Sequence, residues 1–337
     1  MRRWLVLGAL VGVLVALAPI SAAADDVGVV RNFGPNLLGS CSNPEGIARD
    51  PHGNLYTGQQ LAAATGNVCV IDRAGRLVRE IPVAAGSGGV TSFLGMLFTP
   101  GQGLYVADLA NGVAPNGRLL RVDPRSGRVT VLATGFSAPN AIARDDHGNL
   151  FVSDSFAGTI TKVKPDGSRS SIWKQDPLLT TKGTPPFGAN GLAFDRGQRF
   201  LYVANTGDSR VLRIPVERDG SAGPVEVFAD GATIDARQQT TQALHGADGI
   251  MFDVRGNLYV CANQTDQVQV LDPQGSLVAR YAGIGDDAFD FDASLIFHGR
   301  TLYVSNLSLS DAGVNSKLSV LRTPFPGLPL NDRDERQ

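Results

Sequence analysis

Short β-type segments alternate with turns along almost the whole chain, and one pattern of apolar and polar positions recurs six times. Each copy has a short apolar strand, a turn that often contains Asp and Gly, and a second strand similar to Leu-Tyr-Val. Alternation that ends at Gly, Pro, Asn or Asp is typical of β-strands. The copies read PEGIARDPHGNLYTG from Pro44, LGMLFTPGQGLYVAD from Leu94, PNAIARDDHGNLFVSD from Pro139, ANGLAFDRGQRFLYVAN from Ala189, ADGIMFDVRGNLYVCAN from Ala247 and ASLIFHGRTLYVSN from Ala293.

The repeat has a long and nearly regular period. Segments such as GRLLRVD and VTVLATG follow most of the second strands and supply a third and a fourth strand. A period of about 45–50 residues with four strands per unit is typical of a β-propeller. The sequence therefore predicts an all-β, six-bladed β-propeller over residues 25–330. The second strands open at Leu55, Leu104, Leu150, Leu201, Leu258 and Leu302, which are 49, 46, 51, 57 and 44 residues apart.

The last copy has no fourth strand after residues 318–322, whereas the β-type segment 27–33 has no blade of its own. We expect this N-terminal strand to complete the last blade and close the ring, because closure removes exposed sheet edges. The polar residues 331–337 are predicted to be a disordered tail.

The first residues resemble a targeting segment and not a part of the fold. Arg2 and Arg3 precede an apolar run over 4–20, and small residues at 21–24 precede an acidic pair. This order predicts a secretory signal peptide over residues 1–24, with an uncleaved anchor helix as the alternative. The mature protein is then expected to be secreted or periplasmic, with no segment left that crosses a membrane.

Composition narrows the function classes. The net charge is −2 with both signs mixed, so no basic stripe is available for nucleic acid.

The chain has three cysteines, an odd number for an exported protein. Cys41 and Cys69 lie in the first repeat and could pair, although sequence gives no distance between them. Cys261 replaces Ala or Ser of other repeats and is interpreted as a small core residue in preference to a nucleophile.

One position of the repeat carries candidate chemistry. The innermost strand of each blade lines the central channel, and the residue before its Gly-Ile or Gly-Leu step falls at a similar height in every blade. Around the ring, this position is occupied by Glu45, Leu94, Asn140, Asn190, Asp248 and Ala293. Four of the six supply side-chain oxygens, from blades 1, 3, 4 and 5.

Two carboxylates in one narrow channel repel each other unless one takes up a proton or a cation lies between them. Two carboxylates and two amide oxygens, without nitrogen or sulfur, suit a hard cation. Glu45, Asn140, Asn190 and Asp248 are therefore predicted to hold Ca²⁺, with Mg²⁺ or Mn²⁺ as alternatives. The competing interpretation is structural, because single Asn or Asp residues before Gly are common at turns and strand ends.

The same residues carry a family resemblance. The PEG, PNA, ANG and ADG motifs resemble those of the senescence marker protein/gluconolactonase-like family, which includes regucalcin, and more distantly those of diisopropylfluorophosphatase and the paraoxonases. The resemblance covers residues 44–322 and implies a central divalent metal held by Glu, Asn, Asn and Asp, and hydrolysis of lactones or related esters. Ile47 and Ala48 stand where sugar-lactone hydrolysing members tend to have an aromatic residue, and Ser137–Pro139 replace their arginine, so a sugar-acid lactone is disfavoured.

In the predicted reaction the metal polarises a carbonyl and activates water. Asp248 is the candidate general base as well as a ligand, and His245, in the loop 229–247 that leads into Asp248, is a candidate proton shuttle or a solvated loop residue. His52, His147 and His298 fall in turns at the opposite end of the ring. No Gly-x-Ser-x-Gly elbow, phosphate loop or Cys/His zinc spacing occurs.

Two further groups of residues could contribute to the mouth of this site. An acidic cluster is either a solvated loop or a second cation contact, and four phenylalanines near the inner strands either form an apolar pocket or pack in the core. The acids are Asp286, Asp287, Asp290 and Asp292, and the phenylalanines are Phe93, Phe136, Phe187 and Phe291.

The sequence thus predicts an exported, monomeric, metal-dependent hydrolase of lactones or small esters. Two alternatives stay open. One is a non-enzymatic propeller that binds a ligand or a protein and uses calcium structurally; the other is a propeller lyase or strictosidine-synthase-like enzyme, which would not need this donor set.

Overall fold

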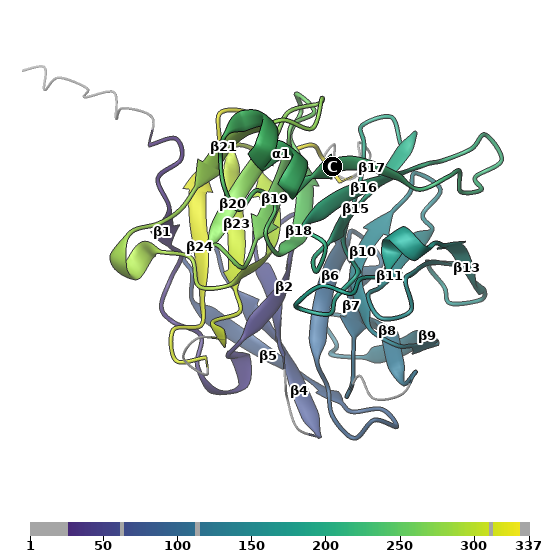
Figure 1. Cartoon of the computed structure of the whole chain (residues 1–337). Coiled ribbons are helices and arrows are strands. Elements are labelled where there is room, and N and C mark those ends of the chain that lie inside the picture. Colours follow the sequence, from purple (N-terminus) through teal and green to yellow (C-terminus); the bar gives the residue numbers. More distant parts are fainter. Residues whose placement is uncertain (1–25, 61–63, 112–114, 310–312, 331–337) are drawn as a thin grey trace, which may run out of the picture.

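The computed structural model describes residues 26–60, 64–111, 115–309 and 313–330. Six four-stranded antiparallel sheets form a ring, which Figure 1 views obliquely, with the inner strands β2 (Pro44–Arg49), β6 (Phe93–Thr99), β10 (Pro139–Arg144) and β18 (Ala247–Phe252) labelled around its centre. The predicted all-β, six-bladed propeller is confirmed. The predicted signal peptide (1–24) and tail (331–337) lie outside the described residues.

The chain runs through the blades in order, and in each blade the strands run from the axis outward. Blade 1 continues from β2 with β3 (Leu55–Gln59), β4 (Thr65–Ile71) and β5 (Leu77–Ala84). Blade 2 continues from β6 with β7 (Gly103–Asp108), β8 (Gly117–Val122) and β9 (Val129–Phe136). Blade 3 continues from β10 with β11 (Leu150–Asp154), β12 (Thr159–Val163) and β13 (Ser170–Gln175). Blade 4 consists of β14 (Ala189–Phe194), β15 (Phe200–Asn205), β16 (Arg210–Pro215) and β17 (Glu226–Asp230). Blade 5 continues from β18 with β19 (Leu258–Ala262), β20 (Gln267–Leu271) and β21 (Leu277–Tyr281).

The sixth blade is assembled from both ends of the chain. It contains β22 (Asp292–His298), β23 (Thr301–Asn306) and β24 (Lys317–Arg322), and its outer strand is β1 (Arg31–Asn32). Arg31 pairs with Val320 and Asn32 with Ser319, and the amide of Gly28 donates to the carbonyl of Arg322 over 2.8 Å. The N-terminal segment therefore closes the ring, as the sequence predicts.

The core consists of apolar layers between neighbouring blades. In blade 5, Tyr259 and Cys261 pack toward blade 6, whereas Leu258 and Val260 pack toward blade 4, following the two-residue alternation of a strand. Cys261 is fully buried, in agreement with its interpretation as a core residue.

The few helical turns lie in the connections between blades. They are the 3₁₀ turns η1 (Gly39–Cys41), η2 (Pro177–Leu179) and η3 (Gly285–Asp287), and the helix α1 (Gly231–Gln238). Residues 229–247 are predicted to be a loop, but they contain α1, which the Asp230 carboxylate caps by accepting from the amide of Thr233 (2.9 Å). Among the described residues, none of these helices is long and apolar enough to cross a membrane.

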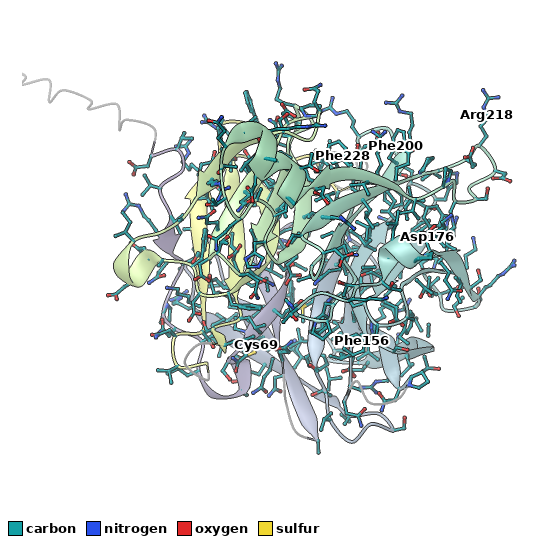
Figure 2. All side chains as sticks on the ribbon, viewed as in Figure 1. Cys69, Phe156, Asp176, Phe200, Arg218 and Phe228 are labelled. Carbon is teal, nitrogen blue, oxygen red and sulfur yellow. A yellow bond between two sulfur atoms is a disulfide. The ribbon has the colours of Figure 1, made fainter. Side chains whose placement is uncertain are left out.

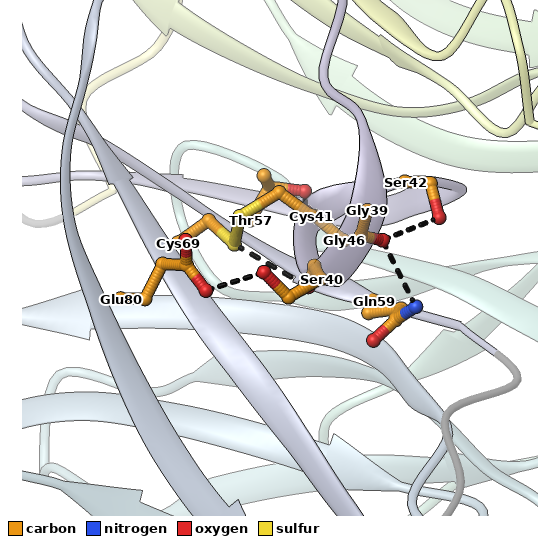
Figure 3. The surroundings of a disulfide bond; sticks show 9 residues. All are labelled: Gly39, Ser40, Cys41, Ser42, Gly46, Thr57, Gln59, Cys69 and Glu80. Atoms are coloured by element: carbon orange, nitrogen blue, oxygen red, sulfur yellow. Dashed lines mark hydrogen bonds between the residues drawn. A yellow bond between two sulfur atoms is a disulfide. The ribbon is translucent and has the colours of Figure 1, made fainter.

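A disulfide fixes the segment that enters blade 1. Cys41 and Cys69 are bonded, with 6.0 Å between their Cα atoms, so the pairing left open by the sequence occurs (Figure 3). The bond links η1 to β4, and the neighbouring Ser40 hydroxyl donates to the Glu80 carboxylate on β5. The chain is thus anchored four residues before Glu45.

Candidate metal centre

The four predicted donors occupy equivalent places in the fold. Each is the second residue of an inner strand. It lies in a β-bulge, where the register of pairing between the first and second strands of the blade shifts. All four side chains are buried, with exposed fractions of 3–6%. They lie at the end of the ring where the inner strands begin, here called the donor face. The donors are Glu45, Asn140, Asn190 and Asp248.

The glycine after the donor position lets neighbouring inner strands approach closely. A Cβ atom at Gly191 would lie 2.1 Å from the carbonyl oxygen of Asp248, and one at Gly46 would lie 2.0 Å from that of Leu94. Contacts this short are impossible for a side-chain atom, so these positions require glycine. The backbone of one donor position therefore packs directly against the next, and this keeps the ring positions level around the axis.

The two carboxyl groups of the ring interact electrostatically. Burial raises the pKa of Glu45 well above its ordinary value, and the negative charge of Asp248 raises it further. Burial also raises the pKa of Asp248, to about 7, while hydrogen bonds from the amides of Asn263 and Asn190 act in the opposite direction. Oε2 of Glu45 is buried and has no hydrogen-bond partner among the described residues. Two buried acids thus share a site in which one oxygen is unpaired.

A second set of polar side chains, not predicted from the sequence, supports the donors. The Asn263 amide donates to Oδ2 of Asp248 (2.7 Å), and the Asn190 amide donates to the Thr206 hydroxyl (2.9 Å). The Asn140 amide lies 3.4 Å from the Ser155 hydroxyl, to which it donates. The hydroxyls of Ser155 and Thr206 then donate to backbone carbonyls of the following blade.

The repeat contains a signal that could have found this supporting set. The sixth residue counted from the leucine of each second strand is Gln60, Leu109, Ser155, Thr206, Asn263 and Leu307. It is polar in blades 1, 3, 4 and 5, which carry the polar donors, and Leu in blades 2 and 6, where the donor position is Leu94 or Ala293. Two repeat positions therefore change from polar to apolar in the same blades.

His245 lies in the loop that leads into Asp248, as predicted. It is partly buried, and its Nδ1 atom is buried without a hydrogen-bond partner among the described residues. Its carbonyl accepts from the amide of Gln264 (3.3 Å), next to the Asn263 that supports Asp248. His52 and His147 are exposed in the turns after their inner strands, as expected, and His298 is exposed as the last residue of β22.

The four phenylalanines near the inner strands divide into two buried and two partly exposed residues. Phe93 and Phe136 are buried in layers between blades, so packing explains both. Phe187 and Phe291 are partly exposed at the donor face. Phe187 contacts a ring that the sequence analysis did not single out, Phe156, which Figure 2 shows well apart from Phe200 and Phe228.

The acidic residues before β22 do not form one group. Asp287 is partly buried and accepts from the amide of Asn32 (2.7 Å), so it serves the closure of the ring. Asp292 is fully buried; its burial, followed by the charge of Asp266 and then that of Asp248, raises its pKa, and the Cys261 thiol opposes this rise. Asp292 is therefore a third carboxyl group that interacts with Asp248.

A cavity of about 450 Å³ occupies the channel at the end opposite to the donor face. Its lining includes the aliphatic residue two positions after each ring position, namely Ile47, Met96, Ile142, Leu192, Ile250 and Leu295. These six side chains form an apolar layer between the donors and the cavity. The rest of the cavity lining is partly charged, with Arg144, Asp146 and Asp195 among its residues.

The residues present fit a hard divalent cation. Every donor atom of the predicted set is an oxygen, one carboxylate oxygen is unpaired, and the two buried acids repel each other. The described residues contain no cluster of three or more His, Cys, Asp and Glu side chains that could hold a metal ion. That these four side chains bind a metal stays a prediction.

Comparison with known families agrees with the resemblance predicted from the sequence. Residues 186–305 match the family model described as SMP-30/Gluconolactonase/LRE-like region. This match includes Asn190 and Asp248, whereas Glu45 and Asn140 lie before it. No curated protein matches the chain.

Several solved structures share the fold over most of the chain. A gluconolactonase from Xanthomonas campestris is 18% identical with a TM-score of 0.62, and the alignment covers 88% of this chain and 89% of that one. A calcium-binding protein, regucalcin, from Agrobacterium tumefaciens is 20% identical with a TM-score of 0.62, covering 88% and 94%. An auxiliary nutrient binding protein from Bacteroides thetaiotaomicron is 13% identical with a TM-score of 0.62, covering 86% and 75%. These likenesses support the propeller fold of the chain.

Proposed function

We propose that this protein is an exported, divalent-metal-dependent hydrolase of lactones or small esters. The observation that carries the proposal is the pair of buried, mutually repelling carboxyl groups, Glu45 and Asp248, level with two asparagine amides in one channel. The family match over 186–305 supports lactone chemistry. The weak identity to each solved structure leaves the substrate open.

In this proposal Glu45, Asn140, Asn190 and Asp248 hold the cation, with Ca²⁺ as the first candidate. A hard divalent cation bound there supplies Lewis-acid polarisation of the substrate carbonyl and lowers the pKa of a coordinated water. Six to eight oxygens surround calcium in proteins, so four protein donors leave positions for water and substrate.

The protein's own groups orient the reaction. Asn263 donates a hydrogen bond to the Asp248 carboxylate and holds it in one orientation. In this proposal Asp248 also acts as the general base that accepts a proton from the attacking water. His245, whose Nδ1 is without a partner among the described residues, would pass that proton to solvent. Export would follow from cleavage of residues 1–24.

Elemental analysis of protein purified without added metal, followed by assays on a panel of lactones and aryl esters, tests this proposal. We expect about one divalent ion per chain and metal-dependent turnover that chelation abolishes. Glu45→Gln and Asp248→Asn should each lower kcat/KM by about 100-fold or more, because each removes a charged ligand. Asp166→Asn, which neutralises an exposed turn carboxylate in blade 3, is the matched control and should leave activity unchanged. Full activity in Glu45→Gln or in Asp248→Asn would refute the assignment.

A binding function without catalysis is the second candidate. It is supported by the auxiliary nutrient binding protein, whose structure matches this chain with a TM-score of 0.62. In that case calcium would raise the melting temperature while no panel substrate is turned over. The same purified protein distinguishes the two functions, since only the hydrolase releases product.

A further inference from the structure

Two phenylalanine rings form a small apolar surface at the donor face. Phe156 follows the second strand of blade 3 and Phe187 lies in the connection that leads into blade 4. Their ring centroids are 5.1 Å apart at an angle of 43°. Phe156 is 42% exposed and Phe187 is partly exposed, so both rings face solvent together. Exposed apolar side chains that cluster beside a polar site are informative, whereas scattered ones are not.

Short connections tie this pair to the amide donors. Ser155, which accepts from the Asn140 amide, directly precedes Phe156, and its carbonyl accepts from the amide of Gly188 over 3.1 Å. Gly188 directly follows Phe187 and is two residues before Asn190. Both rings are thus one to three residues from side chains of the donor ring or its supporting set.

The loop that carries Phe187 is held in place along its length. The Asn205 amide donates to the carbonyls of Leu178 and Thr180, each over 2.9 Å. The amide of Gly207 donates to the carbonyl of Phe187 over 2.9 Å, and the Thr181 hydroxyl donates to the Asp208 carboxylate. The rings are therefore preorganised, and a ligand that covers them loses little ordering entropy.

We propose that Phe156 and Phe187 form an acyl-binding wall, and that the substrates are esters or lactones with a linear or branched apolar chain of several carbons. The inference rests on the proposed hydrolase function for the reaction, but the wall itself is a binding surface. No other blade has an aromatic residue at the place of Phe156, which is held in blades 1, 2, 4, 5 and 6 by Leu61, Ala110, Gly207, Gln264 and Ser308.

The chemistry of the wall predicts which substrates are preferred. Each methylene group that leaves water against the rings can raise kcat/KM up to about fourfold. The rings offer no hydrogen-bond donor or acceptor, so a polyhydroxylated sugar lactone would lose water contacts there without replacement.

The experiment measures kcat/KM for p-nitrophenyl acetate, butyrate and octanoate, and for γ-lactones with side chains of matched length, with the cation-loaded full chain. Binding of sodium acetate and sodium octanoate is measured in parallel by calorimetry, which needs no turnover. The variants are Phe156→Ala, Phe187→Ala and the conservative Phe156→Leu. The matched control is Phe325→Ala. Phe325 is 40% exposed, nearly as much as Phe156, but it lies in the C-terminal segment, on the face opposite to the donors.

We expect wild-type kcat/KM and affinity to rise with chain length. Phe156→Ala and Phe187→Ala should lower both for the octanoyl compounds by about tenfold and leave the acetyl compounds within about twofold. Phe156→Leu should keep most of the preference, and Phe325→Ala all of it.

The outcomes separate this wall from the proposed function. A flat chain-length profile in wild-type protein overturns the wall, as does an equal loss on acetyl and octanoyl compounds in the Phe variants. If no ester or lactone is hydrolysed but octanoate binding depends on Phe156 and Phe187, the hydrolase fails and the wall stands.

Discussion

Removing divalent cations should make the protein less stable as pH rises from about 4 to about 7. Burial holds the pKa of Asp248 near 7, compared with 3.8 for an ordinary aspartate. Between these values the metal-free native state keeps a proton that the unfolded chain has lost. The unfolded state then binds fewer protons than the native state, so stability falls with rising pH across this window. Below about pH 4 both states are protonated and the slope disappears.

The size of the effect follows from the shift. A difference of about three pKa units corresponds to about 4 kcal/mol, since each unit is worth about 1.4 kcal/mol. Glu45 acts in the same direction, because its burial and the charge of Asp248 raise its pKa as well. Added Ca²⁺ should reverse the loss at pH 7, by about 2.7 kcal/mol at a hundredfold excess over its Kd.

Urea unfolding of metal-stripped protein at half-unit steps from pH 4 to pH 7.5, with and without Ca²⁺, measures this slope. Asp248→Asn is the decisive variant because a neutral amide cannot lose a proton. Its metal-free stability should lose the share of the pH slope that comes from Asp248, while the share of the buried Glu45 and Asp292 persists. An unfolding free energy of the metal-free wild-type protein that is constant or rises over this window would refute the reasoning. Such a result would mean that the carboxyl groups of Glu45 and Asp248 are hydrated or paired, and that they do not repel each other in a buried site.

Three other perturbations test the surroundings of the site. Replacing both Cys41 and Cys69 by Ser frees a loop of 28 residues and should lower the unfolding free energy by about 3–4 kcal/mol, measured in urea with and without reductant. Gly191→Ala places a Cβ 2.1 Å from the Asp248 carbonyl oxygen, so it should cost about 1–3 kcal/mol and weaken calcium binding in calorimetry; unchanged values would contradict the close packing of inner strands. Asn263→Ala removes the 2.7 Å hydrogen bond to Asp248 and should weaken calcium binding by about 10–100-fold at pH 7, with the pH dependence of binding shifted upward; unaltered calcium affinity would show that Asn263 has no supporting role.

The fold could be predicted because the repeat is visible in the sequence. Six copies of one strand pair, the turns between them and the unmatched segment 27–33 define both the blade number and the closure. The helix α1 could not be predicted in this way, because a single capped two-turn helix carries almost no periodic signal. Its existence depends on the Asp230 cap and on packing of Ile234 in the layer between blades 4 and 5.

Of the candidate site, only the four donor residues could be predicted from the sequence. A repeat alignment brings Glu45, Asn140, Asn190 and Asp248 to one height, since rotation about the axis maps one blade onto the next. It gives no information on which phenylalanines are buried, and Phe93 and Phe136 pack in the core because neighbouring blades cover them. Contacts between loops of different blades, such as that of Phe156 with Phe187, depend on loop conformations that repeat spacing does not determine.

The donor ring has two chemically different sides, and this asymmetry constrains how a substrate could lie in it. Acidic groups come from blades 1, 5 and 6, where Asp292 adds a third buried carboxyl beside Asp248. Amide donors and the two exposed rings come from blades 3 and 4. An apolar acyl chain placed on the rings would bring its carbonyl over the amide side, because Asn140 and Asn190 are only a few residues from those rings. Water would then attack from the side of Asp248 and His245, the groups proposed to receive its proton. An anionic chain in the reverse orientation would approach the two carboxyl groups of the ring, Glu45 and Asp248, so the electrostatics of the ring favour the same orientation as its apolar wall.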